Sequence, residues 1–162
     1  MRVAGIVGHE KTKFTPRTMA AACHVIRTIL DEVDKGVSGA CPLGGVDVWA
    51  KQIADAIGKP FEEFPPKTNE WATGFKPRNL QIAEASTEVH CIVVAELPAS
   101  YRGMRFAQCY HCNATNHVKS GGCWTAKQAM RMGRRACWHI IAPDGSVTSP
   151  GWVEPTGLEF SL

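Results

Sequence analysis

One unit recurs along the chain and constrains its fold more than any other feature: a short apolar run, a glycine-containing turn and an amphipathic helix. The run RVAGIVG ends at Gly8, and Thr15 then caps a helix whose apolar residues return every three or four positions. The unit repeats where GVSGA leads through CPLGG into a second helix that begins near Val46. Alternating strands and helices of this kind predict an α/β protein with a parallel sheet.

The rest of the chain continues the alternation. FEEF, EVHCIVVAE and ACWHIIAP are strand-sized apolar runs, and helices are expected in PRNLQIAEAS, with Leu80, Ala83 and Ala85 inward, and in WTAKQAMRMGR. A polar loop is expected from Lys67 to Gly74, and Asp144 and Gly145 predict a hairpin turn into a short edge strand ending near Trp152. We therefore expect one domain over residues 1–162, a Rossmann-like three-layer sandwich with a mostly parallel sheet of about five strands, helices on both faces and a C-terminal edge strand.

Composition narrows the class of partner. Hydrophobic residues make up 44% of the 162 residues and charged residues 20%, enough apolar surface for a packed core. The net charge of +3 is small for a protein built mainly to neutralise nucleic-acid phosphates. The apolar stretch in MRVAGIVGHEK covers about five residues, shorter than the core of a signal peptide or a membrane span. These features predict a cytoplasmic protein that does not act in a membrane.

Four glycine-rich or polar segments fall at the predicted strand-to-helix junctions. Parallel sheets bind ligands outside the carboxyl ends of their strands, where helix N-termini attract anions. The segments are Gly8-His9-Glu10, Ser38-Gly39 with Leu43 to Asp47, Pro77-Arg78-Asn79, and Gly121 to Thr125. Together they predict a ligand site at one edge of the sheet.

These segments also carry a family resemblance, which runs from about Arg2 to Ile141. SGACPLGGVDVWA looks like the motif S-G-x-x-x-G-x-D-x-x-A, GGCWTAKQA looks like GG-x-x-T-x-x-A, and an Arg-Asn pair opens the third helix. The chain thereby resembles the SLOG superfamily, the Rossmann-like group that includes the DNA-processing protein DprA and the LOG nucleoside-monophosphate phosphoribohydrolases. The resemblance implies binding of a nucleotide or nucleotide-derived ligand at Gly8, Ser38, Gly39, Gly44, Asp47, Arg78, Asn79, Gly121, Gly122 and Thr125, and His9 is a secondary candidate from its place after the first strand.

The residue types suit a phosphorylated ligand. Gly121 and Gly122 would let a phosphate approach backbone N–H groups at a helix start, with the Thr125 hydroxyl beside them. Arg78 has two interpretations: its planar fork binds a phosphate, or it pairs with a nearby carboxylate. Asp47 also has two: it accepts hydrogen bonds from ribose hydroxyls, or it caps a helix and complements its dipole.

A departure from the hydrolase pattern favours binding over cleavage. The phosphoribohydrolases resemble P-G-G-x-G-T-x-x-E, whose glutamate assists glycosidic cleavage, and the matching position here is Gln128. We therefore expect a sensor or sequestering protein and lean against an enzyme. The alternative is a nucleotide-cleaving hydrolase that uses Glu10, Asp47 or Glu96 as its carboxylate.

A cysteine and histidine insert over residues 107–124 precedes the last glycine loop. Its spacing, C-x2-C-x4-H-x5-C, is typical of a zinc knuckle with an extra residue before the final ligand. Cys109, Cys112, His117 and Cys123 would fill all four positions of a structural zinc, which would clamp the adjoining loop. Reduced surface thiols and redox chemistry at Cys109 and Cys112 are the alternatives, and His111 is an alternative ligand. Cys23, Cys91 and Cys137 stand singly in apolar surroundings and are interpreted as core.

Two other kinds of partner are hypotheses in addition to the small-molecule ligand. Single-stranded nucleic acid is the less favoured partner. It is suggested by a set of aromatic and basic residues: Tyr110, Lys119, Trp124, Arg131, Arg134 and Arg135. The cations of RMGRR also complement the dipole of a helix end. A homodimer through the outer helices is the second hypothesis.

Overall fold

The computed structural model describes residues 1–155, so residues 156–162 of the predicted domain lie outside the described residues. Four α-helices alternate with the strands: α1 (Pro16–Glu32), α2 (Val46–Ile57), α3 (Lys76–Ala85) and α4 (Gly121–Arg131). The strands are β1 (Val3–Gly8), β2 (Lys35–Ser38), β3 (Phe61–Glu63), β4 (Glu88–Val94), β5 (Arg135–Ile141), β6 (Val147–Thr148) and β7 (Trp152–Val153). A 3-10 turn covers Lys11–Lys13, and a π-helical turn covers Trp71–Phe75.

The sheet has the order β3-β2-β1-β4-β5-β6, and its first five strands are parallel. This order confirms the predicted α/β fold, and its switch point lies between β1 and β4. The predicted C-terminal edge strand is present but interrupted: β6 and β7 are two short strands, and both pair antiparallel with β5. Pro150 and Gly151, the latter at φ +104°, separate them because proline has no N–H for the ladder.

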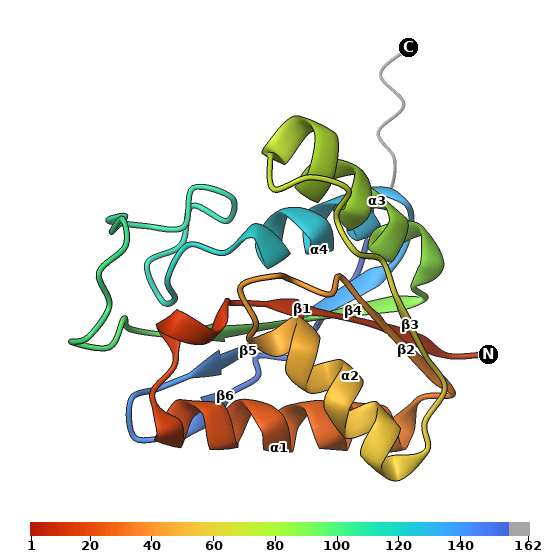
Figure 1. The fold of residues 1–162 in the computed structure, drawn as a ribbon, viewed down its shortest axis with the longest axis horizontal. Coiled ribbons are helices and arrows are strands. Elements are labelled where there is room, and N and C mark those ends of the chain that lie inside the picture. The colour runs from red at the N-terminus through yellow and green to blue at the C-terminus, as the bar shows by residue number, and fades with distance from the viewer. Residues whose placement is uncertain (156–162) are drawn as a thin grey trace.

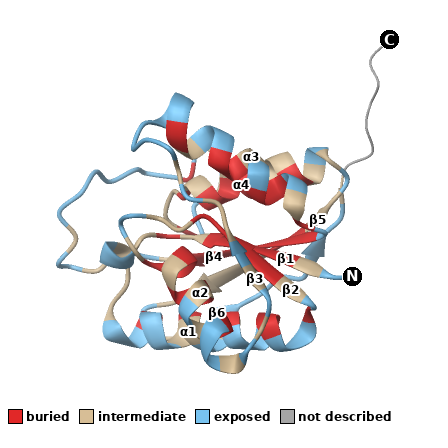
Figure 2. Ribbon diagram, turned by 45° about the vertical axis from the view of Figure 1, so that its right-hand side comes forward, coloured by how far each residue is buried: buried red, intermediate tan, exposed pale blue. Residues whose placement is uncertain are grey.

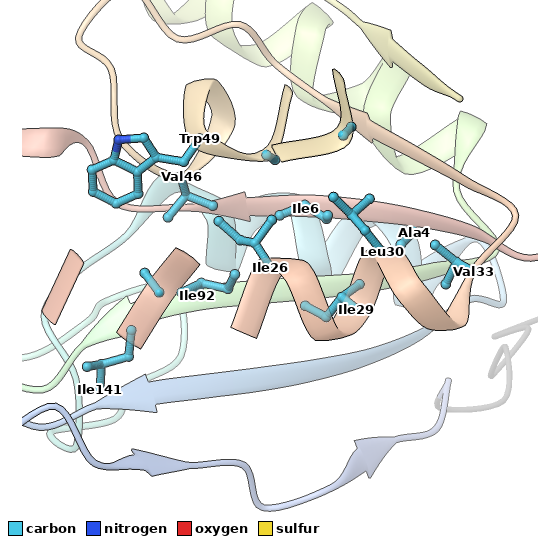
Figure 3. Packing of buried hydrophobic residues seen from close by; sticks show 13 residues of the cluster. Ala4, Ile6, Ile26, Ile29, Leu30, Val33, Val46, Trp49, Ile92 and Ile141 are labelled. Carbon is cyan, nitrogen blue, oxygen red and sulfur yellow. The ribbon is translucent and has the colours of Figure 1, made fainter. Parts of the chain in front are cut away.

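The helices form two layers around the sheet. Helices α1 and α2 cover one face and α3 and α4 cover the other (Figure 1). The sheet between them is the most buried part of the molecule, and β4 is buried along its whole length (Figure 2). On the α1 face, Ile26 and Leu30 pack against Ile6 and Ile92 of the two central strands (Figure 3). No helix among residues 1–155 is long and apolar enough to cross a membrane.

Helix starts follow local chemistry. Thr15 and Thr18 form a reciprocal capping box with Pro16 as the first helical residue of α1. Helix α2 begins after Gly44 and Gly45, both in the positive φ range that favours glycine. Helix α4 begins at Gly121, three residues before the predicted stretch, with Ser120 as its cap.

The π-helical turn and α3 differ from the predicted pattern. The turn occupies the second half of the expected polar loop and runs directly into α3. Helix α3 buries Arg78, Asn79, Ile82 and Ala83, whereas Leu80 and Ala85 are only half-buried. The inward face of α3 therefore starts with two polar residues, which point to a polar space at the sheet edge.

Candidate functional site

A cavity of about 270 Å³ lies at the carboxyl end of β1. Nearly all the residues singled out as ligand-binding line it: Gly8, His9, Gly44, Asp47, Arg78, Asn79, Gly121, Gly122 and Thr125. The other two, Ser38 and Gly39, lie behind its wall, where they hold Asp47 and Arg78. Segments far apart in the sequence thus meet at the switch point between β1 and β4.

A buried ion pair forms one wall of the cavity. Arg78 Nη1 donates to Asp47 Oδ2 at 3.0 Å, and both side chains are less than a tenth exposed. Burial raises the pKa of Asp47 to about 6, although the Arg78 guanidinium opposes that rise. Asp47 is no helix cap, because Gly45 holds that position and Asp47 lies in the first turn of α2. Of the two interpretations of Arg78, the structure shows the pairing with a nearby carboxylate, that of Asp47.

The neighbours of this pair explain two further positions. Arg78 also donates to the carbonyl oxygen of Gly39, and a side chain at Gly39 would overlap the guanidinium. Ser38 Oγ donates to the carbonyl oxygen of Asp47 at 3.1 Å. Both residues therefore position the ion pair from behind.

Two buried polar atoms of the cavity residues lack a partner. Within residues 1–155, Arg78 Nε and Thr125 Oγ1 make no hydrogen bond, and Thr125 is only 1% exposed. An unsatisfied buried donor or hydroxyl costs roughly 1–3 kcal/mol. Such a cost is typical of a site whose polar groups are completed by a ligand.

The N-terminus of α4 opens onto the same space. Ser120 Oγ accepts the N–H of Gly122 at 3.1 Å, which leaves the Gly121 N–H for a ligand. A Cβ at Gly122 would approach the Gly8 nitrogen to 3.0 Å and Cys91 Sγ to 3.1 Å, so Gly122 is needed for packing. A Cβ at Gly121 would meet nothing within 4 Å. Of the two glycines, only Gly121 leaves open space for a ligand.

His9 has a structural task that the sequence did not show. Its Nδ1 accepts the Val94 N–H at 3.1 Å, and its Nε2 lies 3.1 and 3.0 Å from the carbonyl oxygens of Val118 and Lys119. Burial and nearby Lys13 lower its pKa to about 3, so the ring is neutral. Nε2–H is therefore the donor to the two carbonyls. Both ring nitrogens are used, and His9 holds the segment before α4 against β1 and β4.

Several cavity residues were missed as ligand candidates. Lys13 and Lys119 bring positive charge, and Trp71 and Phe75 bring aromatic surface. Phe75 lies under the Arg78 guanidinium at 5.4 Å, and Trp71 meets Trp124 edge-to-face at 5.0 Å. Two aromatic residues four positions apart were the available signal, but Trp71 stood in the stretch interpreted as a polar loop and Phe75 directly followed it.

The cysteine and histidine insert folds into a compact cluster. The ligand atoms of Cys109, Cys112, His117 and Cys123 all lie within 4.8 Å of one another, so these residues could hold a metal ion. A backbone bridge between Cys109 and Ala114 closes the turn, with Asn113 at φ +54°. His111, the alternative ligand, is outside the group.

The surroundings of the cluster suit a metal. His117 Nδ1 lies 2.7 Å from Asn116 Oδ1, which turns Nε2 toward Cys123 Sγ at 3.4 Å. Trp138 Nε1–H donates to the same sulfur at 3.4 Å. Hydrogen bonding to Cys123 lowers the pKa of Cys109 and of Cys112, so thiolates are favoured there. Three sulfurs and one imidazole make a closed tetrahedral donor set.

The residues that suggested hydrolysis and nucleic-acid binding lie in different parts of the structure. Of the three carboxylates named for hydrolysis, Glu10 and Asp47 line the cavity and Glu96 does not. Gln128, at the position of the hydrolase glutamate, is also outside the cavity lining. Lys119 Nζ lies 5.3 Å from the ring centroids of both Phe106 and Tyr110, on the insert. Cys91 and Cys137 are buried as expected, and Cys23 is half-buried.

Comparison with protein-family models gives no match, and comparison with curated proteins gives none either. Among solved structures, the X-ray structure of DNA processing protein A (DprA) from Streptococcus pneumoniae aligns with a TM-score of 0.47 and 19% identity. The alignment covers 89% of this chain and 52% of that chain, so this chain spans about half of the DprA chain. A likeness of this size carries no argument about ligands.

Proposed function

We propose that the cavity binds a nucleotide or nucleotide-derived ligand and that the protein acts as its sensor or sequestering protein. The observation that carries the proposal is the pair of buried, unpartnered polar atoms, Arg78 Nε and Thr125 Oγ1, on residues that line one cavity. A ligand with hydrogen-bonding groups would remove the cost of leaving them unsatisfied.

The charge pattern favours the start of α4 as the position of the ligand's phosphate. The Gly121 N–H and the helix dipole favour an anion there, and Lys13 and Lys119 line the same cavity. Trp71 and Phe75 offer aromatic faces on which a base can stack. The volume of about 270 Å³ lies at the lower end of ligand pockets, which favours a mononucleotide over a dinucleotide.

We further propose that the cluster holds a structural zinc ion. Three cysteines and one histidine would occupy all four tetrahedral positions and leave none for water. The last ligand, Cys123, lies in the first turn of α4, directly after Gly121 and Gly122. When bound, the metal would thus hold the phosphate-binding end of α4 in place.

Hydrolysis is the second candidate function, because Glu10 lines the cavity near Lys13 with 4.0 Å between the charged atoms. Steady release of base or phosphate from the nucleotide would support it. We favour binding, because the position that matches the hydrolase glutamate is Gln128.

Calorimetry with AMP and with adenosine tests the proposal, after native mass spectrometry of the fresh protein has recorded any bound metal or nucleotide. We expect AMP to bind more tightly than adenosine. Thr125→Val removes the unpartnered hydroxyl and should weaken AMP binding about tenfold, or about 1.4 kcal/mol, without loss of stability. Gly121→Ala should fold normally and obstruct the phosphate, because its Cβ points into open space.

Thr28→Val is the matched control, since Thr28 is exposed on α1. Equal AMP affinity in Thr125→Val, Gly121→Ala and the wild type would refute the proposed site. Salt-sensitive binding of oligothymidylate together with no binding of AMP would favour the nucleic-acid hypothesis instead.

A further inference from the structure

A second group of metal-ligating side chains lies on the α1 face of the sheet. The ligand atoms of His90, Cys137 and His139 lie within 4.8 Å of one another. His90 pairs with Cys137 across the parallel strands β4 and β5, and His139 lies two residues further along on the same face of β5. Trp138, which contacts the Cys3His cluster, points to the opposite face. The two groups share no residue.

The two imidazoles are oriented toward each other. His90 Nδ1 and His139 Nε2 are 3.0 Å apart, and the rings stack with an interplanar angle of 15°. The outer nitrogens have partners of their own: His90 Nε2 lies 3.1 Å from Glu88 Oε1, and His139 Nδ1 lies 2.7 Å from Ser149 Oγ. Histidines that bind metals are commonly held in this way, by a carboxylate or another polar group on the outer nitrogen.

The Glu88 carboxylate determines which nitrogen of His90 carries the proton. Its side chain is 3% exposed, and it accepts hydrogen bonds from Arg2 at 2.9 Å and from Arg135 at 3.1 Å. Because the Glu88 oxygens accept hydrogen bonds, His90 Nε2–H is the donor to Glu88, and His90 Nδ1 presents a lone pair to the centre of the group.

We propose that His90, Cys137 and His139 form a second metal site, with Glu88 and Ser149 orienting the two imidazoles. Two imidazoles and one thiolate suit a late first-row divalent ion such as Zn²⁺ or Co²⁺. Three protein ligands leave the fourth position open, unlike the closed Cys3His cluster. Trp152 of β7 packs edge-on against His90 at 5.0 Å, so the short edge strand lies beside the site.

The competing interpretation is a metal-free chain of hydrogen bonds. In that chain, Ser149 donates to His139, His139 donates to His90, and His90 donates to Glu88. Cys137 has no part in it. The thiolate is therefore the feature that separates the two interpretations.

Titration of the purified protein with cobalt chloride tests the second site, with bound cobalt and zinc counted by plasma mass spectrometry. We expect one cobalt ion per chain beyond the metal of the Cys3His cluster, together with a thiolate-to-cobalt absorption band. His139→Asn should lose that ion, because it removes one of the three ligands. Since His139 is only half-buried, its replacement should leave the fold intact. Cys137→Ser should lose the band that the second site contributes.

Two controls separate the sites. His24→Asn changes an exposed histidine of α1 and should leave cobalt uptake unchanged. Cys112→Ser disables the Cys3His cluster and should leave the second band in place. The proposal is overturned if the folded wild type takes up no further cobalt. Uptake and absorption that are the same in Cys137→Ser as in the wild type would also overturn it, even if His139→Asn failed to fold.

Discussion

The buried pair of Arg78 and Asp47 shows what residue types alone leave open. Each residue had two interpretations from the sequence, and only the side-chain geometry shows that they bind each other. Removing one partner of a buried pair leaves an uncompensated charge. We therefore expect Arg78→Met to lower the free energy of unfolding by about 3–5 kcal/mol near neutral pH, as measured by urea denaturation.

The pH dependence of that loss follows from Asp47. Its pKa is raised to about 6, so the folded protein holds a proton that the unfolded chain releases, and this group makes stability fall as pH rises from about 4 to about 6. Without the Arg78 guanidinium, the pKa of Asp47 in the folded protein rises further. The fall in stability caused by Asp47 then extends to higher pH. Arg78→Met should therefore cost more at about pH 8 than at about pH 5. Arg27→Met, which breaks an exposed pair with Asp31, should cost no more than about 1 kcal/mol at either pH. An equal cost for Arg78→Met at both pH values would contradict this account.

At the residue scale, the sequence predicted where the cavity lies better than what each residue contacts. Glycines and polar residues at strand ends marked the cavity, because parallel strands bring their carboxyl ends to one edge. The packing role of Gly122 and the use of both His9 nitrogens depend on neighbours more than 30 residues away in the chain, such as Val94 and Cys91. No local pattern carries that information.

At the element scale, the contrast between α1 and α3 explains what could be predicted. Helix α1 has a capping residue, a proline and a regular apolar stripe, so its start at Pro16 follows from the sequence. Helix α3 buries Arg78 and Asn79 because they line a cavity, and a search for apolar periodicity therefore selected Leu80 and Ala85 instead. A helix that lines a polar site lacks the apolar periodicity by which helices are recognised in a sequence.

The insert over residues 107–124 is the element that we expect to depend most on a metal. Its backbone order rests on few hydrogen bonds, including those from the N–H of Cys109 to Ala114 and from the N–H of Cys112 to Cys109. We expect a chelator to increase amide hydrogen exchange across residues 107–120 at least tenfold, because local opening then costs less free energy. Exchange-mass spectrometry checks this, with the fully buried strand β4 as the internal control. Unchanged exchange in the insert after the metal has been removed would show that the turn folds without it.

At the scale of the whole molecule, the alternation of strands and helices was enough to predict two helical layers around a parallel sheet. It could not predict the division of the C-terminal edge into β6 and β7, which are two residues long each and pair only with β5. The homodimer through the outer helices stays a prediction. The chain's other global property is the proximity of two sites, since α4 begins at the cavity and carries a cluster cysteine in its first turn.

This proximity predicts that metal and nucleotide binding are coupled. His117 is followed by Val118 and Lys119, whose carbonyls are held by His9, and Gly122 packs on Gly8 at the cavity wall. A metal that orders His117 and Cys123 would therefore reduce the cost of ordering the end of α4 where we propose that phosphate binds. Cys112→Ser should release the metal and weaken AMP binding at least about fivefold, which calorimetry can measure.

Thermodynamic reciprocity makes the same coupling testable from the other side. If the metal tightens AMP binding by some factor, AMP must tighten metal binding by that factor. Competition with a chelating dye, with and without AMP, measures the second factor independently of the first. Cys23→Ser, which changes a half-buried cysteine of α1 outside the cluster, should alter neither affinity. If Cys112→Ser loses the metal but keeps the wild-type affinity for AMP, the two sites are independent and the metal serves only to fold the insert.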